Sequence, residues 1–576
     1  MDEKENINND NILSTQTSEE KPGGYITNIK FNNGEDVNLN KNDIIVFVGP
    51  NNAGKSQSLK DIFSLAEKKN SGIVISDIDI FKNSSSVLKL LNKISVGRYQ
   101  GHNFGFDVLN NTFWQINAEN FYRDNIFGAL SKLFIANLDT AARLSICNPP
   151  NNIKRTDAKQ YPIHYAAFDS KYRKWLSNNF KKAFGIDIIP NTQFGSIIPL
   201  CIGTPVNLNE EYEDEQTRQE EYANILEKYD QVQNQGDGIK SFVGILLYLM
   251  LDYFCIYLID EPESFLHPPQ ARIMGQIIGE TLSNQQQAFI STHSEEIIKG
   301  LMDVCPERVK IVRITRQDTV NHFSVLDNKK FNEVWDDPLL KYSNIMSSLF
   351  HKSVVLCESD SDCKIYSIID NHLKQKAGRY SEALFIHCGG KHRMARIVRA
   401  LRSLGIDVKL IPDIDVLNDE NVFRGIVEAF DIEWSAVQRD YNVLASNLHS
   451  SKENINREEA KRHINDILDK SNENNLSKKE VEEIRKSISI SSKWKTIKDV
   501  GFNGVPAGEA SSAIKKMNNT LKEKGIYLVP VGELECFIKD VGGHASDWVN
   551  KVLEKYPDLD DEAYSEIKKF IAELNL

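Results

Sequence analysis

A glycine-bounded turn near the N-terminus has the residue types and spacing of a phosphate-binding loop. It reads Gly49-Pro50-Asn51-Asn52-Ala53-Gly54-Lys55-Ser56 and matches the pattern G-x-x-x-x-G-K-[ST]. An apolar run at 44–48 predicts a strand before the turn, and residues 59–63 predict a helix after it. The backbone N–H groups of such a turn bind phosphate, and its two glycines permit tight curvature. We therefore expect residues 51–56 to bind ATP, with Lys55 at the β- and γ-phosphates and Ser56 on Mg²⁺.

Two carboxylates follow the apolar run 254–259 and suit the hydrolysis of a bound nucleotide. They are Asp260 and Glu261, and they would lie at the carboxyl edge of a parallel sheet, where ligands bind. Asp260 is placed to support Mg²⁺ together with Ser56, and Glu261 is placed to polarise the attacking water. The next predicted strand, at 287–290, ends shortly before His293, which we expect to contact the γ-phosphate.

A short glycine motif, Gly236-Asp237-Gly238, stands before the apolar helix predicted at 242–251. The order of phosphate loop, glycine motif, acidic pair and histidine resembles that of ABC-type ATPases of the chromosome-maintenance and double-strand-break-repair group. Their glycine motif contacts the nucleotide of a second copy, so the resemblance implies a homodimer or higher homo-oligomer around ATP. The motif here lacks the usual serine, whose contact helix N-terminal amides could replace. Gln115 and Gln193 are both candidates for the glutamine-loop residue of these ATPases.

Acidic residues also follow three strands predicted in the C-terminal half, at 353–357, 408–412 and 526–531. They are Glu358 with Asp360 and Asp362, Asp413 with Asp415, and Glu533 with Glu535. Strand ends at one sheet edge can converge, and Asp413 and Asp415 share a side because side chains alternate along an extended segment. Carboxylates suit Mg²⁺ or Mn²⁺, and two such ions can hold the attacking and leaving oxygens of a phosphodiester. The pattern therefore predicts a metal-dependent nuclease site.

A glutamate after a first strand, followed by a glycine turn and D-x-D, resembles the TOPRIM domain of topoisomerases, primases and some nucleases. The resemblance makes Glu358 a general acid/base or a metal ligand. Lys391, which follows Gly389-Gly390, is either a phosphate contact or a surface lysine. An ABC-type ATPase followed by TOPRIM on one chain resembles the OLD (overcoming lysogenization defect) family of endonucleases, over roughly residues 25–550.

The resemblance to the OLD family implies further site residues and partners. It adds Asp362 and Glu535 to the metal ligands, although Asp362 is shorter than the glutamate usual there. It also implies a lysine near the C-terminus, for which Lys551 is the candidate. Family members serve in defence against phage, some beside a helicase or a retron. A helicase, or a reverse transcriptase with its RNA–DNA, is therefore a partner that the resemblance implies.

These residues need two α/β domains to position them, because strands and helices alternate in both halves of the chain. The predicted fold class is α/β: an ABC-type P-loop ATPase domain followed by a TOPRIM domain with a helical insertion. We place the ATPase domain at 25–345, with a helical or dimerisation insertion at about 150–232, and the TOPRIM domain at 346–576, with its insertion at about 421–498. Residues 1–24 are polar and predict a disordered tail, and 332–344 predict a linker.

Composition limits the partners. The 576 residues carry a net charge of -12, so DNA binding would require a local basic face. The 8 cysteines are scattered without any C-x-x-C, which predicts reduced thiols in a cytoplasmic protein rather than a zinc ribbon. The apolar stretch 242–259 predicts a buried helix and strand rather than a membrane span, and 134–146 predicts a strand with Arg143 close to its end.

Together these features predict an ATP-regulated DNA endonuclease that depends on a divalent metal. The competing hypothesis is an ATP-dependent DNA-repair or sensor module whose TOPRIM domain only binds nucleic acid or a partner. Acids after all three strands favour the nuclease.

Overall fold

The computed structural model describes residues 21–68, 70, 72–95, 97–206, 214–317, 320–326, 345–449, 457–470, 475–488 and 493–576. The chain divides into two compact units, Met1–Glu333 and Val334–Leu576. Residues 1–20 of the predicted tail and the predicted linker lie outside the described residues. Among the described helices, none combines the length and the apolar character needed to cross a membrane.

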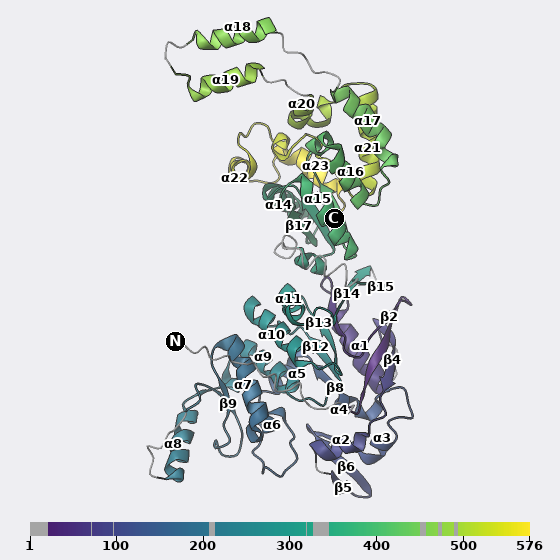
Figure 1. Cartoon of the computed structure of the whole chain (residues 1–576), viewed down its shortest axis with the longest axis vertical. Helices are drawn as coiled ribbons and strands as arrows, with labels where there is room; N and C mark the ends of the chain where they lie inside the picture. Colours follow the sequence, from purple (N-terminus) through teal and green to yellow (C-terminus); the bar gives the residue numbers. More distant parts are fainter. Residues whose placement is uncertain are drawn as a thin grey trace, which may run out of the picture. The chain divides into compact units, whose positions relative to one another are not determined.

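A six-stranded sheet forms the centre of the N-terminal unit (Figure 1). Its strand order is β15-β14-β3-β13-β12-β8, and all neighbours are parallel except β14 and β15. The strands are β3 (Ile44–Val48), β8 (Ile135–Leu138), β12 (Ile256–Asp260), β13 (Gln287–Ser291), β14 (Val309–Gln317) and β15 (Val320–Val325). Every residue of β3 and β13 is buried, as expected for parallel strands covered on both faces. The carboxyl ends of β3, β12 and β13 therefore share one edge.

The helices around this sheet confirm that the apolar stretch 242–259 is a buried helix followed by a strand. They are α1 (Lys55–Lys68), α4 (Ser131–Phe134), α5 (Thr140–Ser145), α9 (Asp237–Leu249), α10 (Pro268–Thr281) and α11 (Glu295–Val304). The strand predicted over 134–146 is wrong beyond Leu138, where β8 ends. The reason is a helix cap: the Asp139 side chain accepts a hydrogen bond from the backbone N–H of Ala142 and starts α5.

Smaller elements complete the N-terminal unit. Two antiparallel sheets precede β8: β1 (Gly24–Phe31), β2 (Asp36–Asn38) and β4 (Ile75–Lys82), then β5 (Gly97–Gln100), β6 (Asn103–Val108) and β7 (Asn111–Trp114). Helices α2 (Val87–Ile94) and α3 (Gln115–Glu119) accompany them. The stretch 150–232 holds α6 (Pro162–Phe168), α7 (Ser170–Phe184), α8 (Glu215–Glu227) and an antiparallel sheet of β9 (Ile188–Pro190), β10 (Leu200–Ile202) and β11 (Asp230–Gln231).

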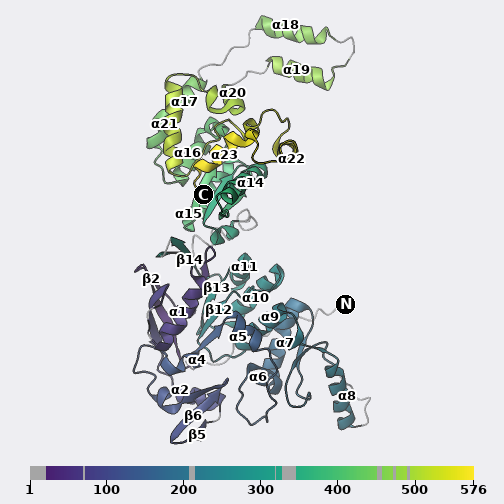
Figure 2. The same cartoon turned by 180° about the vertical axis from the view of Figure 1, so that it is seen from behind.

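The C-terminal unit, whose helices are labelled in Figure 2, is built on a parallel sheet of order β17-β16-β18. Its strands are β16 (Ser353–Cys357), β17 (Ala383–His387) and β18 (Asp407–Ile411). Residues 525–529 run parallel beside β18, because the N–H of Leu410 donates to Gly525 O and the N–H of Tyr527 donates to Leu410 O, each at 2.8 Å. The ends of β16, β18 and this segment therefore share one edge, as the sequence predicted.

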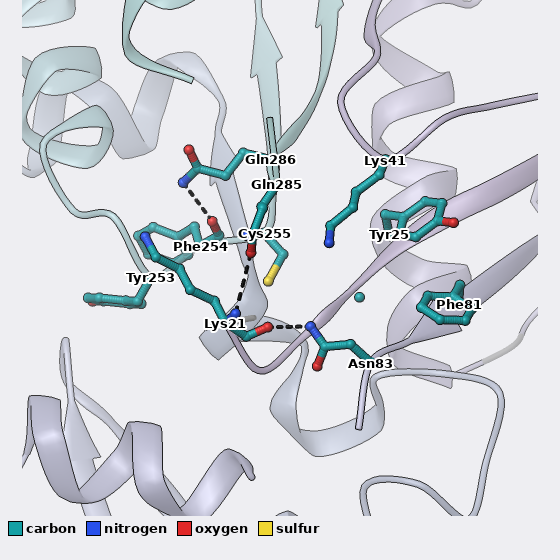
Figure 3. Close-up of a pocket in the computed structure, with 11 residues that line it drawn as sticks. Lys21, Tyr25, Lys41, Phe81, Asn83, Tyr253, Phe254, Cys255, Gln285 and Gln286 are labelled. Atoms are coloured by element: carbon teal, nitrogen blue, oxygen red, sulfur yellow. Dashed lines mark hydrogen bonds between the residues drawn. The ribbon is translucent and has the colours of Figure 1, made fainter. Parts of the chain in front are cut away.

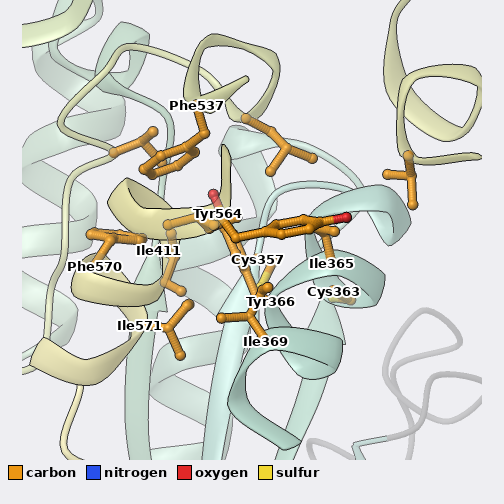
Figure 4. Packing of buried hydrophobic residues seen from close by; sticks show 14 of the residues in the cluster. Cys357, Cys363, Ile365, Tyr366, Ile369, Ile411, Phe537, Tyr564, Phe570 and Ile571 are labelled. Carbon is orange, nitrogen blue, oxygen red and sulfur yellow. The ribbon is translucent and has the colours of Figure 1, made fainter. Parts of the chain in front are cut away.

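Helices α14 (Asp360–Lys376), α22 (Ala545–Lys555) and α23 (Ser565–Glu573) pack together on the sheet. Figure 4 shows the apolar cluster between them, in which Tyr366, Ile411 and Phe570 meet. Val355 and Cys357 of β16 and the fully buried Trp548 of α22 belong to the same cluster. This core fixes the end of β16 directly before Glu358.

The remaining helices are α15 (Lys391–Ser403), α16 (Glu420–Ala429), α17 (Ser435–His449), α18 (Arg457–Leu468), α19 (Lys478–Ile488), α20 (Lys493–Val500) and α21 (Glu509–Glu523). Helix α15 packs on β18 and α16, α17 packs on α21, and α18 packs on α19. The helical character predicted for residues 421–498 is thus seen in its described parts.

Candidate functional site

The phosphate-binding loop has the strand–loop–helix form that its sequence predicted. Three residues take left-handed backbone angles: Gly49 (φ 141°), Asn52 (φ 60°) and Gly54 (φ 105°). A Cβ atom on Gly49 would lie 2.0 Å from the carbonyl oxygen of Ile314, so no side chain fits there. The Lys55 ammonium donates to the carbonyls of Gly49 and Pro50, each at 2.8 Å. The loop is formed, and its lysine folds back over the concave side where a phosphate would sit.

Asp260 and Glu261 stand at the carboxyl end of β12, where the parallel neighbour β13 contributes a hydroxyl. Asp260 pairs in register with Ser291, whose Oγ donates to an Asp260 carboxylate oxygen. Glu261 has a left-handed φ of 47°, and its Oε1 lies 3.6 Å from His293 Nε2. Burial lowers the pKa of His293, and the charge of Lys55 lowers it further. Glu261, His293 and Lys55 therefore lie close together, as a nucleotide site requires.

Arg143 is a residue of this site that the sequence alone did not assign. Its side chain is fully buried and donates to the backbone carbonyls of Asp260 and, at 3.2 Å, Glu261. Burial lowers its pKa, while the nearby charge of Asp260 acts in the opposite direction. A buried guanidinium bound to two successive carbonyls holds Glu261 in its left-handed conformation. No local motif marks Arg143, because its partners lie far away in sequence.

Glu263 fixes the loop that carries the histidine. Its Oε1 accepts a hydrogen bond from the backbone N–H of His293 at 2.6 Å. Burial raises the pKa of Glu263, and the hydrogen bond from His293 opposes this shift. The carboxylate thus ties the turn after β12 to the turn after β13. Its place two residues after Glu261 is the only sequence signal for this role.

The glycine motif lies at the start of α9. Gly236 is the N-cap, and a Cβ on Gly238 would lie 2.5 Å from the carbonyl oxygen of Phe265. The Asp237 carboxylate pairs with Lys240 at 2.8 Å. Its contact with the nucleotide of a second copy stays a prediction.

The two glutamine candidates have local partners. Gln115 donates to Glu119 at 2.7 Å, and the backbone N–H of Gln193 donates to Asn191 at 3.0 Å. Among the contacts of the described residues, neither glutamine reaches the phosphate loop. The choice between them therefore stays open.

Nucleotide affinity is expected to fall as the pH rises above about 8. Burial lowers the pKa of Lys55 to about 8, although Glu261, Glu263 and Asp260 oppose the shift. The free protein thus loses the ammonium charge above that pH, and binding must restore it. Titration with a fluorescent ATP analogue should give an affinity about tenfold weaker at pH 9 than at pH 7. The Lys55→Ala protein should bind weakly at both pH values. Equal wild-type affinity at both would contradict the role of Lys55.

A separate hollow lies at the opposite ends of the same strands. It is lined by residues next to the starts of β1, β3, β12 and β13 and the end of β4, including Lys21, Lys41, Cys255, Gln285 and Asn83 (Figure 3). Lys21 anchors it, since its backbone N–H donates to Gln285 and its carbonyl accepts from Asn83. Because it borders the amino ends of the strands, this hollow is distinct from the nucleotide site.

In the C-terminal unit, the acids after the three strand ends face one another. Burial raises the pKa of Asp413 well above its usual range, and the charges of other carboxylates raise it further. Those carboxylates are Asp362, Glu358, Asp415 and Glu533. Carboxylates that oppose one another's ionisation would be stabilised by a cation among them. We call these residues, together with Glu535, the carboxylate cluster.

Two buried carboxylate oxygens of the cluster accept no hydrogen bond. Glu358 Oε2 and Asp415 Oδ1 are buried, and neither has a hydrogen-bond partner. Burial raises the pKa of Glu358, and the charge of Asp415 adds to the effect. Hard oxygen donors of this kind fit Mg²⁺ or Mn²⁺. In the part of the chain that the structure describes, no three His, Cys, Asp or Glu side chains lie close enough together to hold one metal ion.

Asp362 and Glu535 belong to the edge of the cluster. Asp362 closes a capping box with Ser359, accepting from its backbone N–H at 2.7 Å. Burial raises the pKa of Asp362, and the charge of Glu535 raises it further. Glu535 itself accepts from the N–H of Ala545 at 2.7 Å and lies 2.5 Å from His544 Nδ1. Both acids have protein partners, which a metal would have to share.

Three lysines are candidates for a cation near the carboxylate cluster, and the structure gives the contacts of each. Lys391 pairs with Asp415 at 3.1 Å, and Lys498 pairs with Glu533 at 3.1 Å. Lys551 pairs with Asp547 one turn away on α22, and its described contacts do not reach the cluster. The geometry therefore favours Lys498, which the sequence alone placed in the helical insertion, over Lys551.

The pKa of the Lys498 ammonium is raised above its ordinary value. Burial alone would lower its pKa, but the hydrogen bond and charge of Glu533, with Asp415 and Asp413, outweigh burial and raise it. In turn, Lys391 and Lys498 partly oppose the rise that burial causes in the pKa of Glu358. Lys498 is thus a cation directed at the carboxylate cluster.

Comparisons with known proteins agree with this division of the chain. Residues 167–298 match the family model "AAA ATPase domain", and residues 349–415 match "Overcoming lysogenization defect protein-like, TOPRIM domain". The chain is 20% identical over 242 residues to the Old nuclease of Escherichia phage P2, a region covering 38% of this chain and 40% of that protein. The matched region thus spans less than half of the curated relative.

Solved structures that resemble the chain include SMC head domains. One, from Pyrococcus furiosus, is 12% identical, with a TM-score of 0.30, and covers 55% of this chain and 99% of its own. Another, from Thermotoga maritima, is 12% identical, with a TM-score of 0.29. The match covers 54% of this chain and 100% of that structure's chain. The two family models, in this order on one α/β chain, confirm the predicted fold class, a P-loop ATPase domain followed by a TOPRIM domain. With the similarity to the Old nuclease, they show that the chain resembles ATPase–TOPRIM proteins of the OLD family.

Proposed function

We propose that the protein is an ATP-regulated DNA endonuclease that depends on Mg²⁺ or Mn²⁺. The observation that carries the proposal is the carboxylate cluster, where four other acids raise the pKa of the half-buried Asp413 and two oxygens lack partners. A protein that merely bound DNA would gain nothing from burying carboxylates that repel both one another and phosphate. Such a cluster is useful when it holds cations against a phosphodiester.

The chain's own residues have distinct parts in the proposed reaction. Glu358, Asp413 and Asp415, with Asp362 and Glu535, would hold the metal ions, which would supply positive charge at the phosphodiester and lower the pKa of a bound water. The water oxygen bonds to phosphorus, the bond to the leaving deoxyribose oxygen breaks, and that oxygen takes a proton from a solvent water. Glu358 accepts the proton that the attacking water releases. Glu358 suits this because burial raises its pKa. Lys498 stabilises the negative charge that grows on the phosphate oxygens.

The ATPase unit would control this chemistry. Lys55 and Ser56 bind the phosphates and Mg²⁺, Glu261 orients water, and His293 contacts the γ-phosphate. Gly236, Asp237 and Gly238 of a second copy would close the site, so the working form is a homodimer or larger. We further propose that it acts in the cytoplasm against phage, alongside a helicase or a reverse transcriptase with its RNA–DNA.

The competing function is a DNA-repair or sensor module without nuclease activity. It is favoured by one observation: within the described residues, no ready-made group of three metal ligands exists. In that case the C-terminal unit would bind nucleic acid or a partner, and ATP hydrolysis would be the only chemistry.

A nicking assay separates the two functions. Supercoiled plasmid is incubated with Mg²⁺ or Mn²⁺, and the Glu358→Ala/Asp413→Ala protein is compared with the wild type. We expect the double variant to lose more than about 100-fold in rate, since even an outer-shell change at a metal site costs about 10–100-fold. Its ATPase rate should stay unchanged, which shows that the N-terminal unit is folded. Equal inertness of both proteins on every form of DNA would refute the nuclease.

A further inference from the structure

Helix α15 is a strongly basic element in an acidic protein. It contains five cations and no acidic residue, whereas the chain as a whole carries a net charge of -12. The cations are Lys391, Arg393, Arg396, Arg399 and Arg402. Arg393, Arg396 and Arg399 are exposed, while Met394, Val398 and Leu401 are buried against the unit. The cationic side of the helix therefore faces solvent, and the apolar side secures it.

The first turn of α15 is attached to the carboxylate cluster. The N–H of Gly390, the N-cap residue, donates to the carbonyl of Glu358 at 3.2 Å. Lys391, the first residue of the helix, pairs with the Asp415 carboxylate at 3.1 Å. Gly389 and Gly390 have φ of 68° and 108°, which permits this sharp entry. The cationic row thus starts at the site where the proposed cleavage would occur.

Two acids beside α15 pair with arginines other than Arg393, Arg396 and Arg399. Glu428 of the adjacent α16 pairs with Arg424 at 2.7 Å, and Asp431 pairs with Arg402 at 2.6 Å. Arg402 is therefore committed to the body of the unit, and its guanidinium also lies over the ring of Phe430. Arg399 donates once, at 3.1 Å, to the carbonyl of Gly425, which leaves further N–H groups to donate.

The spacing of the exposed arginines matches a nucleic-acid strand. Arg393, Arg396 and Arg399 follow one another at three-residue steps, forming a row inclined to the helix axis. From the first to the last, the helix rises about 9 Å. One DNA strand presents a phosphate every 3.4 Å or so along its axis, hence about three over this distance.

We propose that Arg393, Arg396 and Arg399 form a phosphate track that binds the backbone of duplex DNA and leads it to the carboxylate cluster. The inference rests on the proposed nuclease function and adds how the substrate is held. Backbone phosphates are the same at every sequence, so the track contributes affinity without sequence preference. It also supplies the local basic face that an acidic chain needs for DNA.

The test is the salt dependence of DNA binding, measured by fluorescence anisotropy on a short labelled duplex in EDTA so that no cleavage occurs. The protein carries Arg393→Gln, Arg396→Gln and Arg399→Gln together. Each lost phosphate contact lowers the slope of log Kd against log salt by about 0.9, so the triple variant should lose about two to three units. Its affinity should fall about tenfold or more at low salt, equally for duplexes of different sequence.

Two controls distinguish the track from a general effect of net charge and from a loss of folding. Arg457→Gln, Lys461→Gln and Arg462→Gln on α18 remove the same charge and should leave the slope nearly unchanged. Lysine in place of all three α15 arginines should restore the slope, which shows that charge and not folding was lost. If wild-type protein cuts DNA while the glutamine variant keeps its slope and affinity, the track is refuted and the nuclease stands. An equal loss in the α18 variant also refutes it. A wild-type protein that neither binds nor cuts DNA refutes both.

Discussion

Replacing Asp413 by asparagine is expected to abolish DNA cleavage while making the metal-free protein harder to unfold. Asp413 is half-buried, and its pKa is raised by desolvation and then by Asp362, Glu358 and Asp415. Asparagine keeps the shape but removes the charge that the other acids oppose. The variant loses a ligand for the metal, so cleavage should fall more than about 100-fold. Relief of the buried charge should add about 1–3 kcal/mol at neutral pH, or roughly 2–8 °C in Tm.

The raised pKa of Asp413 also predicts how the stability of the metal-free protein changes with pH. A carboxyl group whose pKa is raised on folding binds more protons in the native state than in the unfolded chain. Stability therefore falls as the pH rises from about 3.8 towards the raised pKa of Asp413. The metal-free wild type should lose stability across this range, and the Asp413→Asn protein should lose less of it. Chemical unfolding in EDTA at a series of pH values measures the difference.

Asp360 offers a matched control for the same substitution. It follows the same strand end as Glu358, but it is exposed and pairs with Lys364 at 2.7 Å. The hydrogen bond with Lys364 lowers its pKa. Asp360→Asn should therefore keep cleavage and should not raise Tm. If Asp413→Asn lowered Tm in EDTA, or cut DNA at the wild-type rate, the metal-site assignment would fail.

The parts of the site that sequence could predict are those set by local rules. The phosphate loop is a strand, a turn and a helix within one short segment, and its glycines have the left-handed angles that the motif requires. The acids of the carboxylate cluster were predictable because each follows an apolar strand, and parallel strands end at one edge. Neither inference needed knowledge of distant contacts.

The residues that sequence missed act through distant partners. Arg143 binds carbonyls more than a hundred positions away, and its segment reads as a strand because the cap at Asp139 is a single side chain. Lys498 lies in α20, among polar helices with no strand or glycine signal. Lys551 was inferred from its position near the C-terminus, and a position does not specify where a lysine on an exposed helix points.

Lys551, which was inferred from the sequence, and Lys498, which the structure places beside the carboxylate cluster, should therefore respond differently to substitution. Lys498→Ala is expected to slow cleavage about 100- to 1,000-fold, the cost of losing one donor to a developing oxyanion. Lys551, paired with Asp547 on α22, should tolerate alanine with little change in rate. Single-turnover cleavage at saturating DNA is the proper measurement, because the charge of Lys498 acts on the chemical step. A loss confined to DNA affinity would contradict this role.

The Lys498→Ala variant could be slow for either of two reasons, and a second substitution distinguishes them. The substitution leaves the Glu533 carboxylate, which Lys498 contacts at 3.1 Å, without its cation, and that defect alone could distort the cluster. The Lys498→Ala/Glu533→Gln protein removes the unpaired charge. If the lysine stabilises the reacting phosphate, the double variant stays as slow as the single one, because the missing charge is still missing. If Lys498 served only to neutralise Glu533, the double variant would recover the cleavage rate. The role of Lys498 would then be structural and not catalytic.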